Sequence, residues 1–150
     1  DGRYHGPVLL RDALANSYNI PPIQLLRDVG ISNFIQTART MGIESLQEPS
    51  GYYGLALTLG GGEVTLLEMA HAYATLANAY LMNGQVKESI ETNLKTLKLS
   101  PDFAVAHNNL AIAYLEDGQP ALALEHADKA AELGYEVAPE ILKELEPFRV

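Results

Sequence analysis

The second half of the chain shows a regular spacing of hydrophobic and polar positions. Apolar side chains recur three and four positions apart, which is the spacing of one face of an α-helix. Gly84, Gly118 and Gly134 follow three of these stretches, and Ser100-Pro101 follows another. Glycine accepts the left-handed conformation at a helix end, and proline cannot continue a helix. The pattern therefore predicts helices at about 71–83, 86–99, 104–116, 120–133 and 138–147.

The same pattern recurs at an offset of 34 residues. Leu76 matches Leu110 and Tyr80 matches Tyr114, so a leucine and a tyrosine lie four positions apart on the first helix of each copy. Small residues around them let a neighbouring helix approach closely. A fixed period of this length indicates stacked helix pairs. Further identical pairs are Ala72/Ala106, Ala77/Ala111, Ala79/Ala113, Leu81/Leu115, Gly84/Gly118, Gln85/Gln119, Glu91/Glu125, Lys95/Lys129 and Leu99/Leu133.

This pattern resembles the tetratricopeptide repeat family, whose period is also 34 residues. The leucine, small, tyrosine, glycine and alanine positions match in both copies, and the first copy has the closing proline of the family at Pro101. Where the family usually has alanine in the second helix, the first copy has the small residues Ser89 and Thr96. The resemblance implies a mainly α fold over about 70–150, with repeats at 70–103 and 104–137 and a solvating cap helix at 138–147.

In this family the first helices of the repeats line a concave groove that binds a peptide or a partner protein. Asn78 and Asn108 have amides able to hydrogen-bond a peptide backbone, and His107 and Asn108 are expected at the surface. The lysines with which some members hold a terminal carboxylate are absent. The alternative is a solvated or mutually packed face without a ligand. By position the groove would be lined by His71, Ala74, Asn78, Leu81, Met82, Val105, Asn108, Ile112, Leu115 and Glu116.

Residues 1–69 show a more interrupted pattern. A loop-like stretch with several glycines covers 43–62, and its apolar LALTL segment at 55–59 predicts a short strand or a buried extended segment. Gly60-Gly61-Gly62 lacks the frame of a phosphate-binding loop and indicates a tight turn into the next helix. Short helices are predicted at 7–16, 22–29 and 33–41, the last of them capped by Ser32 and ended by Gly42.

Three stretches of this half resemble the transpeptidase domain of class A penicillin-binding proteins. They are GPVLLRDALANSYNIPPIQLL, DVGISNFIQTARTMGI and YGLALTLGGGEVTLLEMAHAYATLAN, which together cover about 1–78. In that family an S-x-N sequence is the middle of three active-site motifs. The resemblance places Ser17 and Asn19 in it, where the serine helps to move protons and the asparagine holds the acyl donor.

The other two motifs of that active site do not occur in the chain. No serine is followed three residues later by lysine, and no lysine is followed by Thr-Gly or Ser-Gly. A serine acyl-enzyme needs the nucleophile of S-x-x-K and its lysine. In the family one missing motif lies upstream of these stretches and the other downstream, so the chain resembles an excised middle. We therefore expect no enzyme activity, and a vestigial Ser17 and Asn19 that cap a helix and form a turn.

Composition narrows the choice of ligands. The net charge of −9 disfavours nucleic acid and anionic membrane surfaces, and no apolar run is long enough for a membrane span. There is no cysteine, and the four histidines lack metal-ligand spacing, so neither a metal nor a cofactor is expected. The expected partner is a peptide or protein in the groove, or a second copy of the chain.

Usage of basic residues changes along the chain. Residues 1–86 contain arginine and no lysine, whereas later basic residues are lysines except for Arg149. This switch indicates two segments of different origin, 1–69 and 70–150, with a shared helix at about 64–83. Because about three repeats are usually needed for stability, helices of the first segment are expected to cap the first repeat.

Three functions remain open. The favoured one is a non-catalytic scaffold fused to an inactive transpeptidase fragment. The second is a peptidoglycan transpeptidase or beta-lactam binder, and the third is a designed or recombined chimera without an evolved function. The resemblance implies a bacterial origin, with a cytoplasmic location for this chain by itself and an extracytoplasmic one for the parent transpeptidases.

Overall fold

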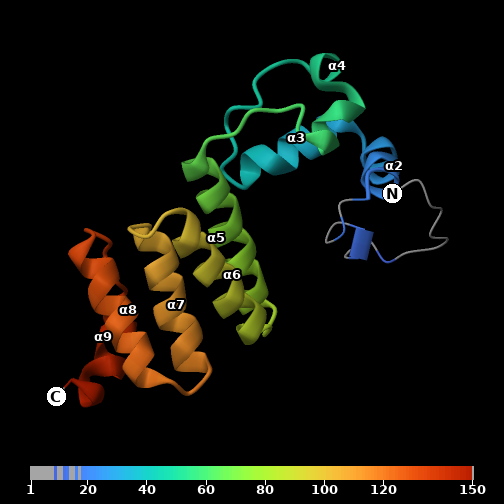
Figure 1. Ribbon diagram of the computed structural model, residues 1–150. Coiled ribbons are helices and arrows are strands. Elements are labelled where there is room, and N and C mark those ends of the chain that lie inside the picture. Colours follow the sequence, from blue (N-terminus) through green and yellow to red (C-terminus); the bar gives the residue numbers. More distant parts are fainter. Residues whose placement is uncertain (1–8, 10–11, 14–15, 17, 150) are drawn as a thin grey trace. The chain divides into compact units, whose positions relative to one another are not determined.

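The computed structural model describes residues 9, 12–13, 16 and 18–149 of the chain. These residues form the helices α2 to α9 and two short 3-10 helices, and no strand occurs among them (Figure 1). The predicted mainly α class is confirmed. Most of the helix predicted at 7–16 lies outside the described residues. The chain divides into two compact units, and the second begins at Thr65 and also includes Met41–Ile43.

The first unit consists of short helices around a small core. Helices α2 (Ile20–Val29) and α3 (Ile31–Thr40) are separated by Gly30, whose φ of 85° favours glycine. Helix α4 (Ser50–Tyr53) leads directly into the 3-10 helix η1 (Gly54–Leu59). The buried side chains of this unit include Leu26, Ile35, Ala38, Leu46 and Tyr53.

Two local predictions for the first unit are wrong. Ser32 lies inside the first turn of α3 and does not cap it, because Gly30 ends α2 and α3 already starts at Ile31. The LALTL segment forms η1 and not a strand or an extended segment. With no partner strand among the described residues, its backbone groups pair locally, and the Gly61 N–H donates to the Ala56 carbonyl at 2.9 Å.

The second unit begins with the long helix α5 (Leu66–Met82), which starts before the repeat helix expected at 71–83 and lies within the shared helix expected at about 64–83. A capping box explains the early start. The Thr65 hydroxyl accepts from the Glu68 backbone N–H at 3.2 Å, and the Glu68 carboxylate accepts from the Thr65 backbone N–H at 2.7 Å. Two backbone N–H groups at the helix start, those of Thr65 and Glu68, thereby gain hydrogen-bond acceptors.

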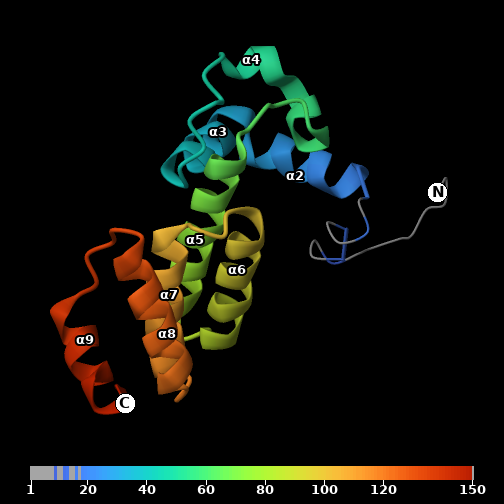
Figure 2. The same ribbon diagram turned by 60° about the vertical axis from the view of Figure 1, so that its left-hand side comes forward.

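Four further α-helices follow in the second unit. The bounds predicted at 86–99 and 104–116 are confirmed, and those predicted at 120–133 and 138–147 differ by a few residues. Helix α5 packs against α6, α6 against α7 and α7 against α8, and Figures 1 and 2 show α9 beside α8 at the end of this array. The elements are α6 (Val86–Leu99), α7 (Ala104–Glu116), α8 (Pro120–Glu132), α9 (Pro139–Leu145) and the 3-10 helix η2 (Glu146–Phe148).

The turns inside the two helix pairs have the same conformation. Gly84 and Gly118 have φ values of 73° and 72°, which confirms the left-handed glycines predicted at these positions. The N–H of the following residue then reaches back to a tyrosine carbonyl, from Gln85 to Tyr80 at 2.9 Å and from Gln119 to Tyr114 at 2.8 Å. The 34-residue repeat of the sequence is therefore also a repeat of backbone structure.

The cores of the two helix pairs differ in polarity. On α8 the buried positions are Ala123, Ala127 and Ala130, which pack in one apolar cluster with Leu110 of α7 and Leu145 of α9. The residues 34 positions earlier, on α6, are also buried but polar: Ser89, Asn93 and Thr96. The second pair consequently has the more apolar core.

Candidate functional site

The outward face of α5 is the first part of the candidate binding surface. The five predicted residues are three, four or one apart, which places them on one side of the helix. His71 and Asn78 are exposed, and Met82 is 83% exposed. Leu81 is half-buried and Ala74 is buried. An exposed thioether and an exposed amide therefore lie on the same face of α5.

The corresponding face of α7 is less accessible. Val105, Ile112 and Leu115 are half-buried, Asn108 is buried and Glu116 is exposed. Val105 packs against the cluster around Phe103, and Leu115 packs against the cluster around Leu110. Among the predicted residues of α7, Glu116 is thus the one that is exposed.

The segment Met41–Ile43 borders the face of α5 near its start. A Cβ atom added to Gly42 would lie 2.9 Å from the His71 Cβ, so the backbone passes directly over this side chain. The His71 ring also meets the Phe103 ring edge-on, with 4.8 Å between ring centroids. These contacts hold His71 in place although its side chain remains exposed.

Asn109 is a buried polar residue that sequence reasoning missed. Its amide Nδ2 donates to the Ala74 carbonyl oxygen at 3.4 Å, a hydrogen bond between α7 and α5. The link joins the two first helices, which carry the candidate surface. Asparagine in the middle of an amphipathic helix gives no signal of its own, because spacing alone does not say which carbonyl it will reach.

Two histidines of the second repeat form a pair between α7 and α8. The Nδ1 atoms of His107 and His126 are 2.8 Å apart, and His107 Nε2 lies 3.0 Å from the Pro101 carbonyl oxygen. The Tyr114 ring stacks on the His126 ring with a 9° angle between planes. The prediction that His107 and Asn108 lie at the surface is wrong, since each is 8% exposed. The helix start at Ala104 turns both residues toward neighbouring helices.

The surroundings of His126 disfavour its charged form. Burial lowers the pKa of His126, and the nearby His107 lowers it further, while the negative charge of Glu125 opposes both effects. The ring is therefore held neutral to a lower pH than a histidine in water.

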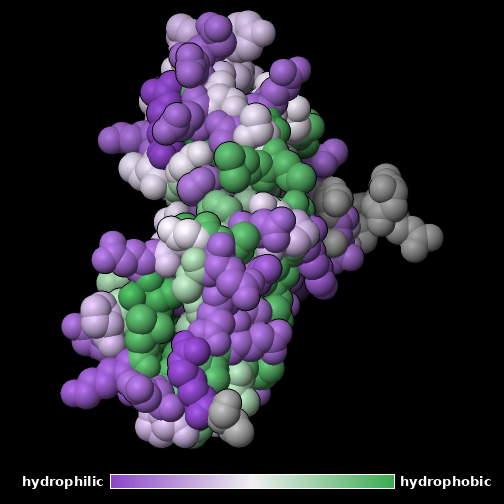
Figure 3. All heavy atoms as spheres, turned by 90° about the vertical axis from the view of Figure 1, so that its left-hand side faces the viewer, coloured by the Kyte–Doolittle hydropathy of each residue, from purple (hydrophilic) through white to green (hydrophobic). Residues whose placement is uncertain are grey.

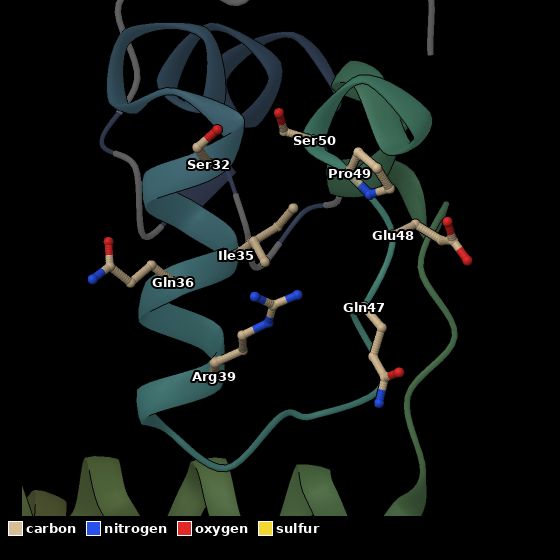
Figure 4. Close-up of a pocket in the computed structure, with 8 residues that line it drawn as sticks. All are labelled: Ser32, Ile35, Gln36, Arg39, Gln47, Glu48, Pro49 and Ser50. Carbon is tan, nitrogen blue, oxygen red and sulfur yellow. The ribbon is translucent and has the colours of Figure 1, made fainter.

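A pocket of about 530 Å³ lies in the first unit, between α3 and the segment that leads into α4 (Figure 4). The Arg39 side chain donates to the Leu46 carbonyl oxygen, which ties α3 to that segment. Arg39 and Glu48, which carry opposite charges, are both exposed. The lining residues are Ser32, Ile35, Gln36, Arg39, Gln47, Glu48, Pro49 and Ser50.

Of the two residues expected to be a vestigial motif, Asn19 lies directly before α2. Ser17 is outside the described residues. Asn19 is exposed at the position before the helix, its side chain makes no capping hydrogen bond, and its carbonyl oxygen accepts from the Ile23 N–H at 3.3 Å. No geometry of an acyl site is defined by these atoms.

A membrane-spanning helix and a metal site each have structural requirements that can be compared with the described residues. Within that part of the chain, no helix is both long and apolar enough to cross a membrane. No three histidine, aspartate or glutamate side chains in the described ranges are grouped so that they could hold a metal ion. Figure 3 shows hydrophobic surface interrupted by hydrophilic side chains on the face drawn.

The family model described as tetratricopeptide repeat matches residues 92–125. This match runs from α6 through α7 into α8, so it contains the packing between the two helix pairs, and it ends one residue before His126. The resemblance read from the sequence is confirmed for this stretch.

The chain is also similar to penicillin-binding proteins. It is 37% identical over 110 residues to penicillin-binding protein 1A of Neisseria meningitidis and 36% identical over the same length to that of Neisseria gonorrhoeae. These matches cover 73% of this chain and 13% of each relative. Penicillin-binding protein 1C of Escherichia coli is 34% identical over 77 residues, which are 51% of this chain and 10% of that protein. The chain thus spans a small part of these relatives.

The 110-residue length of the matches to the 1A proteins shows which residues they share with the tetratricopeptide match. Any stretch of 110 residues in a chain of 150 must include residues 41–110, since it starts no later than 41 and ends no earlier than 110. The similarity to the 1A proteins therefore includes α5, α6 and the first half of α7. Residues 92–110 belong to both similarities.

Proposed function

We propose that residues 65–150 act as a non-catalytic scaffold that binds an extended peptide or a protein segment along the face of α5 and α7. The observation that carries the proposal is the matching register of α5 and α7, the first helix of each repeat. They hold equivalent residues 34 positions apart, and Asn109 links them by its hydrogen bond to Ala74. A surface built from rigid, repeated helices can present side chains at fixed intervals to one extended ligand.

The chemistry of the exposed residues defines the ligand expected. Met82 offers a flexible apolar contact, and the Asn78 amide can both donate to and accept from a peptide backbone. Glu116 adds a negative charge at the end of α7, and the chain as a whole carries a net charge of −9. A peptide with one apolar anchor and a basic residue fits these groups, and a second copy of this acidic chain fits less well.

Peptide display against the full chain, followed by fluorescence anisotropy with a selected peptide, tests this surface. Replacing Asn78 and Met82 together by alanine should weaken binding by about tenfold or more, because both lose direct contacts. Lys87→Ala is the control, because Lys87 is exposed on α6, outside the proposed surface. This substitution should leave the affinity unchanged. Equal affinity of the double variant and the wild type would place the peptide elsewhere.

Catalysis by the same 150 residues is the second candidate, and the identity with penicillin-binding proteins favours it. We propose that the chain nonetheless does not act as a transpeptidase, because it contains neither S-x-x-K nor K-T-G. Ser17 and Asn19 are then remnants of a motif without its partners. A fluorescent penicillin should leave no covalent label on the chain after denaturing electrophoresis, with an intact penicillin-binding protein as the positive control. A stable label would contradict the proposal.

We further propose that the chain combines segments of two origins that share α5. The change from arginine to lysine along the sequence supports this view, whereas the overlap of the two similarities begins at residue 92, after α5. A natural recombination and a deliberate fusion would give the same features.

A further inference from the structure

The histidine pair between α7 and α8 has a defined proton arrangement. The Pro101 carbonyl oxygen can only accept, so Nε2 of His107 must carry a hydrogen. In the neutral ring Nδ1 of His107 is then an acceptor. The facing Nδ1 of His126, 2.8 Å away, must therefore be the donor, which leaves Nε2 of His126 without a hydrogen.

Adding protons to this pair changes the bond in two steps. One added proton leaves one N–H···N bond in place. If it enters Nε2 of His126, the bond is unchanged; if it enters Nδ1 of His107, the hydrogen of His126 moves to its Nε2 and His107 becomes the donor. A second added proton puts a hydrogen on both facing Nδ1 atoms. Two N–H groups cannot hydrogen-bond each other at 2.8 Å, and two positive rings repel, so the rings must separate.

Few other charged groups act on the pair. Glu125, the residue before His126 on α8, favours a proton on His126, while burial and His107 oppose it. From α7, Tyr114 covers a face of the His126 ring. Asp102 lies next to Pro101 in the turn before α7 and is exposed. Nearby on α8, Asp128 pairs with Arg149 and Lys129 pairs with Glu132, and both pairs are exposed.

We propose that the His107–His126 pair is a pH-sensitive clasp that holds α7 to α8 at neutral pH and releases them in acid. The first repeat contains no such device, because the equivalent positions 34 residues earlier are Tyr73 and Thr92. The clasp acts on the second repeat, whose first helix also carries Asn108 and Asn109. It depends only on the contacts of this repeat and stands whether or not the α5–α7 face binds a peptide.

Both proton steps change stability in the same direction: the first leaves the clasp closed but costs stability because the pKa of His126 is lowered, and the second opens the clasp because two positive rings repel. In the unfolded chain a histidine takes up its proton near pH 6.5, whereas the folded ring does so only at lower pH. Between these two values the unfolded state binds more protons, so stability falls as the pH falls. Above about pH 6.5 the neutral pair is intact and this contribution does not change.

Ring nitrogen NMR of the wild-type chain at pH 8 tests the proton arrangement without any substitution. His107 should show its hydrogen on Nε2, and His126 should show the less common hydrogen on Nδ1. Hydrogens on Nε2 in both rings would overturn the proposal, because the facing Nδ1 atoms would then have no shared hydrogen.

Urea unfolding of the full chain between pH 5 and pH 8 tests the release. The wild-type unfolding constant should rise on acidification, by about tenfold for each unit by which the pKa of His126 is lowered. H107Y/H126T, which installs the residues of the first repeat, should lose that part of the pH dependence. H71Q, which removes a histidine outside the pair, should retain it. An unchanged pH dependence in the double variant would overturn the clasp.

Discussion

At the residue scale, the second helices of the two repeats show how the same backbone accepts different buried side chains. Asn93 and Thr96 of α6 donate to the carbonyl oxygens of Ser89 and Thr92 within the helix, each at 3.1 Å. The Ser89 hydroxyl and the Asn93 Oδ1 are buried without a hydrogen-bond partner among the described residues. Buried polar atoms without partners cost free energy, so the first repeat has a weaker core than the second.

Replacing Ser89 by alanine should raise the free energy of unfolding by about 1 kcal/mol, because it removes an unpartnered hydroxyl from a fully buried position. Alanine already occupies the equivalent position 123. Thr96→Ala is the control, since Thr96 has its hydrogen bond and an alanine counterpart at 130. Urea unfolding at pH 8 measures both variants. A gain in stability from Thr96→Ala as large as that from Ser89→Ala would contradict the argument.

At the scale of elements, α9 closes the end of the helix array. Leu145 is fully buried and belongs to the same cluster as Leu110, Ala127 and Val137, while Leu142 on the same short helix is 37% exposed. The Arg149 guanidinium after η2 pairs with the Asp128 carboxylate of α8. This exposed pair adds little by itself, and the burial of Leu145 is the main contribution.

Leu145→Ala should lower the free energy of unfolding by about 2 to 4 kcal/mol, because it leaves a cavity between α8 and α9. Leu142→Ala, made on the same helix, should cost less than about 1 kcal/mol. Thermal or urea unfolding followed by circular dichroism compares the two. If both substitutions have the same small effect, α9 does not seal the core.

At the scale of the whole molecule, the number of repeats limits stability. The second unit contains two helix pairs and a short terminal helix, and arrays of this kind usually need about three repeats. We therefore predict that residues 65–150, which keep the capping box at Thr65, melt at a lower temperature and less cooperatively than the full chain. Calorimetry of both proteins measures this. Equal melting temperatures would show that the second unit needs nothing from the first.

The sequence by itself determined the helical class, the turns and the repeat, because these depend on signals within a few residues. Apolar spacing set α6 and α7, and glycine at positions 84 and 118 set the turns between paired helices. It also indicated the tetratricopeptide and penicillin-binding similarities that the comparisons confirm. The candidate surface on α5 and α7 remains a prediction, although the sequence already placed its residues on one face of each helix.

Only the tertiary structure decided which polar side chains meet. The His107–His126 pair joins residues 19 apart, and the Asn109 bond to Ala74 joins residues 35 apart. Neither follows from spacing along one helix, because each depends on how two helices are rotated against each other. The 3-10 helix at Gly54–Leu59 was missed for a related reason: an apolar run forms a strand only where a partner strand is available, and that is a property of the folded chain.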